Sequence, residues 1–139
     1  PFCPSMLDTV GPQMIKVDTL RGVVDLPPGW HPAPFMTFTF EVAEEWKTRV
    51  PEVVHEDGTS RAQVLKREYN PRYYDMMKAL EVLTGNGVSL NTSLNRRGEP
   101  MICSPTDALN MFYGSDLQYL IMEDILVVKD GVDPYDTLG

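Results

Sequence analysis

Residues 55–63, with the sequence HEDGTSRAQ, gather groups that could hold an anion beside a turn. Asp57-Gly58 is a turn signal, with strand-like residues on both sides. Arg61 follows the turn, and its planar guanidinium can donate two parallel hydrogen bonds to a phosphate or carboxylate. A local ion pair of Arg61 with Asp57 or Glu56 is the alternative.

A second polar segment covers residues 91–100, with the sequence NTSLNRRGEP, directly after a predicted strand. Short amides and hydroxyls can bind ligand oxygens and nitrogens, and the carboxyl ends of strands are where α/β sheets usually place ligands. The same residue types also build ordinary turns by bonding their own backbone. Arg96 and Arg97 add positive charge that could meet phosphate or lie in water.

The remaining chemistry-bearing residues give weaker signals. His55 beside a turn is more typical of a structural histidine than of a catalyst, and His31 lies between a tryptophan and prolines. Cys3 and Cys103 form no CxxC pair, so the sequence predicts no metal site. It contains no P-loop, no GxSxG elbow and no Rossmann fingerprint, so any ATP would have to be bound in another way.

Short strands and helices must position these segments. Proline, glycine and apolar periodicity predict helices over 43–49, 71–84 and from Ser104 to near Gly114. Arg61, Gln63 and Leu65 share one face of a predicted strand. The full set of predicted strands is 14–17, 22–26, 36–42, 52–55, 59–66, 88–90, 117–122 and 124–128. Strands interleaved with helices predict an α/β, or mixed α+β, layered fold.

Length and charge narrow the function classes. The 139 residues, 42% of them hydrophobic, predict one domain over 1–139 with a single core. Twelve Lys and Arg against 20 Asp and Glu give a net charge of −8, which disfavours nucleic acid and anionic membranes as partners. Neither a membrane span nor a signal peptide is evident, so we expect a cytoplasmic protein. A first residue that is Pro and not Met predicts a piece of a longer chain.

Taken in order, several motifs resemble the carbamoyltransferases of the nodulation and antibiotic-biosynthesis type. The resemblance covers essentially the whole chain, and its two longest motifs, HxDGTxRxQ and NTSxNxxGEP, are specific. The motifs are Pro1-Phe2-Cys3-Pro4-Ser5, Pro34-Phe35-Met36, His55-x-Asp57-Gly58-Thr59-Ser60-Arg61-x-Gln63, Asn70-Pro71, Thr84-Gly85, Asn91-Thr92-Ser93-Leu94-Asn95-x-x-Gly98-Glu99-Pro100 and Pro105-x-Asp107-Ala108.

The resemblance implies the carboxy-terminal, YrdC-like domain of those enzymes. That fold is a twisted mixed sheet with flanking helices, here incomplete at its amino-terminal end. The family's domain is understood to use carbamoyl phosphate and ATP, with Mg²⁺ accompanying the nucleotide, to form carbamoyl adenylate. A separate amino-terminal Kae1-like domain, which holds iron, then transfers the carbamoyl group to a hydroxyl of the acceptor.

Site residues also follow from the resemblance. Arg61 is expected to hold phosphate oxygens, and Ser93 with Asn95 to bind the phosphate or carbamoyl end. These three are the expected catalytic residues. The residues expected to shape or support the pocket are His55, Asp57, Gln63, Asn91 and Thr92.

The chain also departs from the family pattern. Relatives carry a Lys/Arg-containing stretch before the PFxPS motif, and this chain starts inside that motif. We therefore expect half of an active site and negligible turnover by the chain alone. Two alternatives remain open at this point: a synthase of threonylcarbamoyl adenylate, which needs a threonine pocket, and a non-catalytic module for subunit association or effector binding. The sequence names neither the acceptor nor the oligomeric state.

Overall fold

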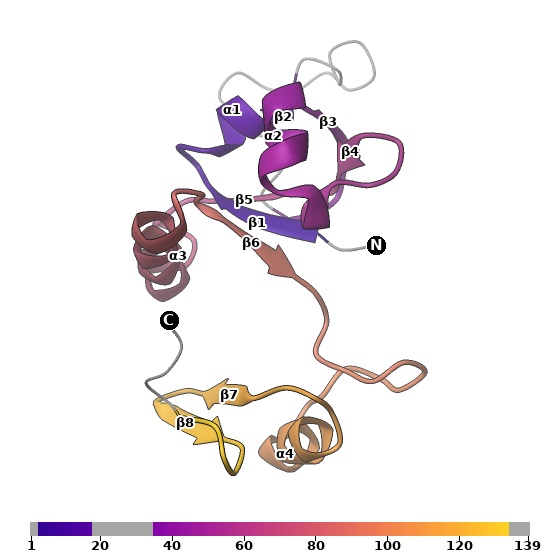
Figure 1. Cartoon of the computed structure of the whole chain (residues 1–139), viewed down its shortest axis with the longest axis vertical. Helices are drawn as coiled ribbons and strands as arrows, with labels where there is room; N and C mark the ends of the chain where they lie inside the picture. Colours follow the sequence, from indigo (N-terminus) through magenta and orange to yellow (C-terminus); the bar gives the residue numbers. More distant parts are fainter. Residues whose placement is uncertain (1–2, 18–34, 134–139) are drawn as a thin grey trace. The chain divides into compact units, whose positions relative to one another are not determined.

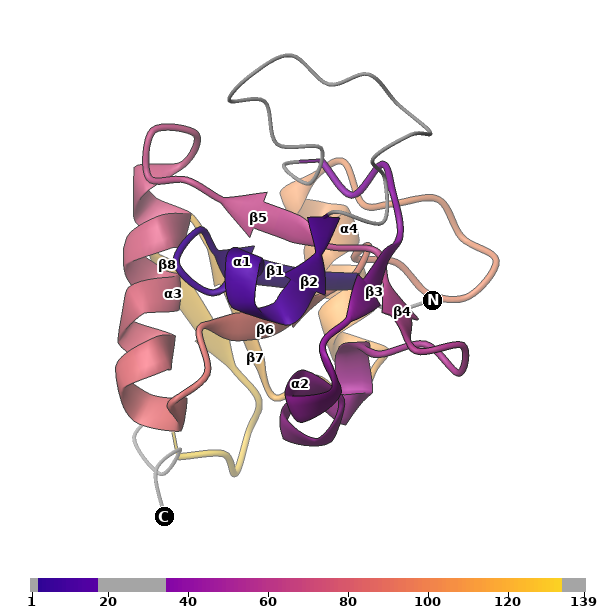
Figure 2. The same cartoon turned by 90° about the horizontal axis from the view of Figure 1, so that it is seen from above.

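A computed structural model of the chain describes residues 3–17 and 35–133 and is mixed α+β, as predicted (Figures 1 and 2). Its contacts divide the chain into two compact units, Pro1–Thr92 and Ser93–Gly139, and each is described by itself. The predicted strand over 22–26 and His31 lie outside the described residues. Among the described residues, no helix has both the length and the apolar character that a membrane span requires.

The main sheet of the first unit has the strand order β5-β1-β6. Strand β1 (Cys3–Leu7) runs parallel to β5 (Gln63–Leu65) and antiparallel to β6 (Val88–Asn91). All five residues of β1 are buried. The sequence analysis missed β1 because a central strand buried on both faces shows no alternation of apolar and polar residues.

A second, antiparallel sheet of the first unit has the order β2-β3-β4. Its strands are β2 (Ile15–Lys16), β3 (Phe40–Val42) and β4 (Thr59–Ser60). The predicted 36–42 strand is shortened to β3, and Met36 adopts a positive φ of 54°, which is incompatible with a strand. Helix α1 (Gly11–Met14) precedes β2.

Helix α2 (Glu44–Arg49) confirms the predicted helix over 43–49, with Trp46 buried. Pro51 ends the helical run, but the strand predicted over 52–55 is wrong. Residues Pro51–Val53 instead form a 3₁₀ helix, η2, because proline fixes a helical φ at its first position.

The single strand predicted over 59–66 is divided between the two sheets. Strand β4 pairs with β3, whereas β5 pairs with β1, and Arg61 and Ala62 connect them. Ser60 is fully buried, and its hydroxyl donates to the Val53 carbonyl over 2.7 Å. The strand is divided because its two halves pair with different neighbouring strands. The alternation of side chains along a strand predicts which face each residue occupies, but it does not predict the pairing partner.

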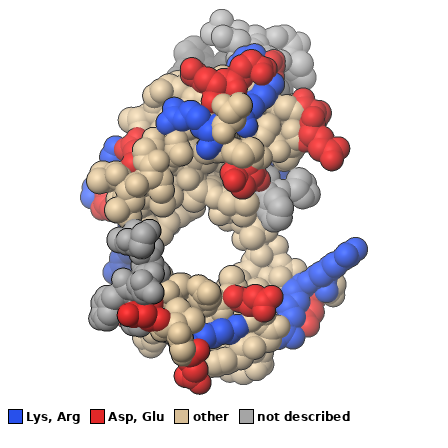
Figure 3. Space-filling model, viewed as in Figure 1, with Lys and Arg blue, Asp and Glu red and all other residues tan. Residues whose placement is uncertain are grey.

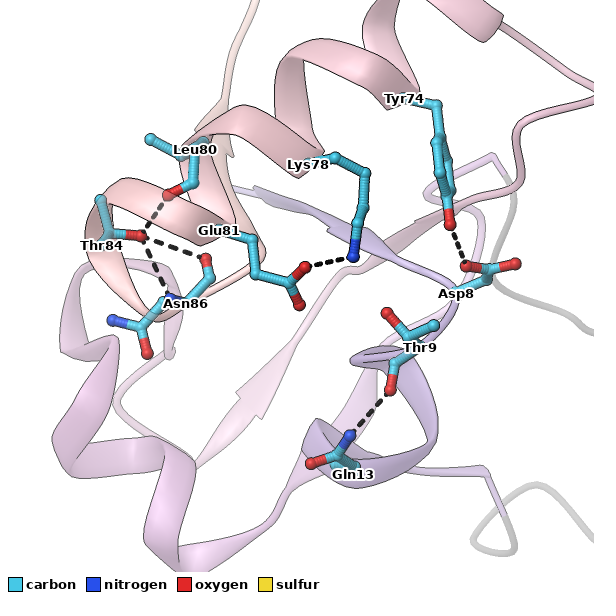
Figure 4. A network of polar contacts seen from close by, with 9 residues as sticks. All are labelled: Asp8, Thr9, Gln13, Tyr74, Lys78, Leu80, Glu81, Thr84 and Asn86. Carbon is cyan, nitrogen blue, oxygen red and sulfur yellow. Dashed lines mark hydrogen bonds and ion pairs between the residues drawn. The ribbon is translucent and has the colours of Figure 1, made fainter.

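Helix α3 (Pro71–Thr84) has the bounds that the sequence predicts, because both of its caps are local. The Asn70 side chain accepts a hydrogen bond from the Tyr73 backbone N–H over 3.1 Å, and Gly85 ends the helix with a φ of 73°. Tyr74 donates its hydroxyl to Asp8 over 3.0 Å, which ties the helix to the segment after β1 and raises the pKa of Tyr74 (Figure 4).

The second unit is built from helix α4 (Pro105–Tyr113) and a hairpin of β7 (Tyr119–Met122) and β8 (Ile125–Val128). Its small cluster is Ala108, Phe112 and Leu120. The apolar segments 117–122 and 124–128, predicted as strands, form this hairpin, but they are not core strands, because Ile121 and Ile125 are 71% and 62% exposed. The single core expected from chain length is therefore two clusters among the described residues, and the larger lies in the first unit.

Candidate functional site

One face of the β5-β1-β6 sheet is lined by polar side chains. Ser5 lies opposite Gln63 on one side and opposite Ser89 on the other, and Cys3 lies opposite Asn91. Residues in register on neighbouring strands point to the same face of a sheet. We call this set the polar face: Cys3, Ser5, Gln63, Ser89 and Asn91.

A closed triangle of hydrogen bonds joins one residue from each strand of the polar face. Ser5 Oγ donates to Gln63 Oε1 over 2.8 Å, and Asn91 Nδ2 donates to Ser5 Oγ over 3.0 Å. Asn91 Nδ2 also lies 3.3 Å from Gln63 Oε1. Ser5 is fully buried, so no water competes for its hydroxyl. The triangle therefore fixes how the two amides are oriented.

Arg61 lies beside this triangle, between β4 and β5. Its Nε donates to Cys3 Sγ over 3.0 Å, and Cys3 is the register partner of Asn91. The alternative of a local ion pair is not realised: within residues 35–133, Arg61 forms no ion pair with Glu56 or Asp57. Arg61 is exposed, and among the described residues its hydrogen bond is made through Nε, so the two terminal nitrogens can donate to an anion.

The turn before β4 holds the other predicted residues of the 55–63 segment. Asp57 Oδ1 accepts from the Thr59 backbone N–H over 2.9 Å and from the Thr59 hydroxyl over 2.6 Å. These two bonds hold the pKa of Asp57 below its ordinary value of 3.8. His55 Nδ1 lies 3.2 Å from Thr59 Oγ1. Asp57 and His55 thus stabilise the turn that precedes β4 through their contacts with Thr59.

Ser93 and Asn95 belong to the second unit and hold a loop together. Ser93 Oγ donates to Asn95 Oδ1 over 2.5 Å, and Asn95 Nδ2 donates to the carbonyls of Arg96 and Glu99 over 3.2 and 2.8 Å. The turn-building role considered for this segment is therefore what the structure shows. Arg96 Nη2 donates to the Asn110 carbonyl near the end of α4 over 2.6 Å.

A pocket of about 430 Å³ lies in the second unit between this loop and α4. Asn95, Arg96, Cys103 and Asp107 are among its lining residues. Hydrogen bonding to Asp107 raises the pKa of the Cys103 thiol, whereas hydrogen bonds from Ser104 and Cys103 lower the pKa of Asp107. The raised pKa lowers the thiolate fraction of Cys103, and the thiolate is the nucleophilic form.

Six of the eight predicted site residues therefore form three pairs. Gln63 and Asn91 meet through Ser5, His55 and Asp57 meet through Thr59, and Ser93 bonds Asn95. Arg61 lies in the first unit while Ser93 and Asn95 lie in the second, so the predicted set is divided between the units. Thr92 is exposed at the end of the first unit.

Three residues of the polar face were missed as site residues, namely Ser89, Cys3 and Ser5. For Cys3 and Ser5 a signal was present in the PFCPS segment, where they are spaced two apart and so share a face of any strand formed there. The segment was not recognised as a strand, and so neither residue could be placed beside Arg61.

Charge on the surface and possible metal ligands were compared with the predictions. In Figure 3 the visible face of the first unit shows Lys and Arg intermixed with Asp and Glu, without one continuous basic patch. In the part of the chain that the structure describes, no group of three His, Cys, Asp or Glu side chains could hold a metal ion.

Comparison with known proteins decides the family. The family described as Carbamoyltransferase C-terminus matches residues 1–129. The chain belongs to this carbamoyltransferase C-terminal family. Membership confirms the resemblance drawn from the motifs.

The curated relatives of this chain are much longer proteins. Nodulation protein NolO of Bradyrhizobium diazoefficiens is 34% identical over 93% of this chain and 22% of its own length. Nodulation protein NolNO of Sinorhizobium fredii is 32% identical over 98% of this chain and 19% of its own length. An uncharacterized protein of Synechocystis is 34% identical over 93% of this chain and 22% of its own length. The chain thus spans about a fifth of the length of these relatives.

Proposed function

We propose that this chain is the part of a carbamoyltransferase that activates the carbamoyl group. It takes carbamoyl phosphate and ATP and forms carbamoyl adenylate, with release of phosphate and pyrophosphate. Membership of the carbamoyltransferase C-terminal family supports the class of reaction. We place this reaction at the polar face of the β5-β1-β6 sheet, beside Arg61.

The observation that carries the proposal is the position of Arg61. Its guanidinium is fixed through Nε by Cys3 and is exposed on an otherwise acidic chain. Both substrates carry phosphate, and a bidentate arginine neutralises phosphate charge while holding its oxygens in a defined direction. Making a mixed anhydride requires that neutralisation, because negative charge collects on the reacting groups.

The remaining components fit around this arginine. Mg²⁺ would accompany ATP, bound to the phosphates of the nucleotide. A Kae1-like domain holding iron would pass the carbamoyl group to a hydroxyl of the acceptor. A substrate role for Ser93 and Asn95 stays a prediction, since both side chains already brace their loop.

Calorimetric titration of the purified protein tests the proposed substrates. Carbamoyl phosphate, ATP with Mg²⁺, and L-threonine are titrated separately. We expect heat of binding from carbamoyl phosphate and from ATP, and none from threonine.

The other outcomes distinguish the alternatives. Binding of threonine together with ATP would favour a synthase of threonylcarbamoyl adenylate. Binding of none of the three, by a protein whose circular dichroism shows a folded chain, would contradict the proposal and favour a non-catalytic module.

A further inference from the structure

Asn86 and Gly87 connect the end of α3 to β6, and the proposed carbamoyl chemistry uses neither residue. Asn86 is half-buried and Gly87 is buried. The Asn86 backbone N–H donates to Thr84 Oγ1 over 3.1 Å (Figure 4), and the Gly87 carbonyl accepts from the Leu7 backbone N–H over 3.0 Å. Among the described residues, the Gly87 N–H donates to no acceptor. The backbone nitrogen that follows Asn86 is therefore not engaged in the hydrogen bonding of the fold.

Glycine at position 87 leaves this nitrogen with the least steric cover, because glycine has no Cβ. The packing also requires glycine here: a Cβ at Gly87 would lie 2.7 Å from Leu7 Cδ1 and 3.1 Å from Val10 Cγ2. When glycine follows asparagine, the side-chain carbonyl carbon is most open to attack by the next backbone nitrogen. Asn86-Gly87 is the one Asn-Gly pair in the 139 residues.

Arg49 at the end of α2 holds the Asn86 side chain. Arg49 Nη2 donates to Asn86 Oδ1 over 2.7 Å and to the Gly85 carbonyl over 3.1 Å, and Arg49 Cζ lies 4.1 Å from the centroid of the Trp46 ring. A guanidinium has only donors, so the Asn86 atom that faces it is the oxygen. A cation fixed at this oxygen stabilises the negative charge that develops there when a nucleophile adds to the amide carbon.

We propose that Asn86 is a site of spontaneous deamidation and that Arg49 promotes the reaction. The Gly87 nitrogen adds to Asn86 Cγ and forms a C–N bond, while the proton of that nitrogen passes to water. The Cγ–Nδ2 bond then breaks, and its nitrogen leaves as ammonia. Water opens the resulting cyclic imide, which gives aspartate when the new C–N bond breaks and isoaspartate when the original peptide bond breaks. The inference does not depend on the proposed function.

The products change the connection into β6. The aspartate form places a carboxylate beside Arg49, and a charge-assisted pair is stronger than the amide contact that it replaces. The isoaspartate form lengthens the main chain by one carbon directly before β6, the strand that carries Ser89 and Asn91 of the polar face. The modification therefore acts on the segment that leads into the candidate site.

Peptide mass spectrometry of the purified, folded protein after prolonged incubation at neutral pH tests the site. Replacement of the side-chain NH₂ by OH raises the mass of the peptide that contains Asn86. We expect this increase at Asn86 and, in the same samples, none at Asn95 or Asn110, because the residues after them, Arg96 and Met111, carry a Cβ that covers the attacking nitrogen. Absence of the increase at Asn86 would overturn the inference.

Three variants, each checked for folding by circular dichroism, test the role of Arg49. Arg49→Met removes the donor and should slow deamidation at Asn86 by about tenfold. Arg49→Lys keeps a cation without the planar fork and should slow it less, so this variant decides the question if Arg49→Met does not fold. Arg72→Met, which removes an exposed arginine of α3, is the matched control and should leave the rate within about twofold. An unchanged or faster rate in the Arg49 variants, or equal slowing in Arg72→Met, would overturn the role of Arg49.

Discussion

Asp57 illustrates how a side chain can shape the turn beside a candidate site without reacting in that site. Its carboxylate receives two hydrogen bonds from Thr59 and shapes the turn that leads to Arg61. Those bonds favour the ionised form, so the pKa of Asp57 is lower in the folded than in the unfolded chain. A carboxylate stabilised in this way is a weak general base.

The lowered pKa of Asp57 predicts a dependence of stability on pH. Because the folded pKa is depressed, the contribution of Asp57 is fully present above its ordinary value of 3.8 and is lost as the pH falls through the folded value. We expect the free energy of unfolding to fall less steeply with acid in Asp57→Asn than in the unaltered protein. Urea titrations at pH 6, 5, 4 and 3 measure this.

Asp75 offers a control of the same type for this prediction. It is exposed and pairs with Arg67 on the surface. Parallel curves for the unaltered protein and Asp57→Asn between pH 5 and 3 would contradict the assigned role of Asp57, whereas Asp75→Asn is expected to change the slope little.

The residues of the site were predictable in type but not in grouping. Arg61, Gln63 and Asn91 stand in motifs that are recognisable in the chain, and their chemistry follows from their side chains. These residues are brought close together because β1 lies between β5 and β6. That pairing joins segments far apart in the sequence, so local patterns do not predict it. Ser5 and Cys3 were missed for the same reason.

Elements with local signals were predicted best. Helix α3 begins at Pro71, directly after its cap Asn70, and is ended by Gly85, so all of its boundary signals lie within a few residues of its ends. The strands depend on partners far along the chain. This explains why β1 was missed and why the 59–66 strand was divided between two sheets.

The capping of α3 supports a prediction at this scale. Asn70→Ala removes the acceptor of the Tyr73 backbone N–H and should lower the free energy of unfolding by about 1 kcal/mol. Urea unfolding followed by circular dichroism measures the change. Asn70→Asp keeps an acceptor at the cap and should lie within a few tenths of a kcal/mol of the unaltered protein. Equal losses in the two variants would show that the side chain caps nothing.

At the scale of the whole molecule, the two units differ in how much apolar surface they bury. The core of the first unit draws on both of its sheets and on α2 and α3, whereas the second unit buries Ala108, Phe112 and Leu120. Ile121 and Leu126 lie opposite each other on the hairpin, 71% and 50% exposed. A unit with a small core opens at a lower free energy.

Hydrogen exchange tests this difference in stability. The backbone amides of β7 and β8 should exchange faster than those of β1, measured in the same sample of the purified protein. The amides of α3 should exchange at rates between those of the hairpin and β1, because the helix packs on the larger core along one face. Protection of the hairpin equal to that of β1 would contradict this account.

The most direct test of the central claim is the affinity for carbamoyl phosphate when Arg61 is removed. We predict that Arg61→Ala weakens binding by about 10- to 100-fold, the range expected for loss of a charge-assisted pair of hydrogen bonds. Arg72→Ala removes the same charge from the exposed surface of α3 and should leave the dissociation constant within about twofold. Unchanged affinity in Arg61→Ala, or equal weakening in both variants, would contradict the assignment of the phosphate site to Arg61.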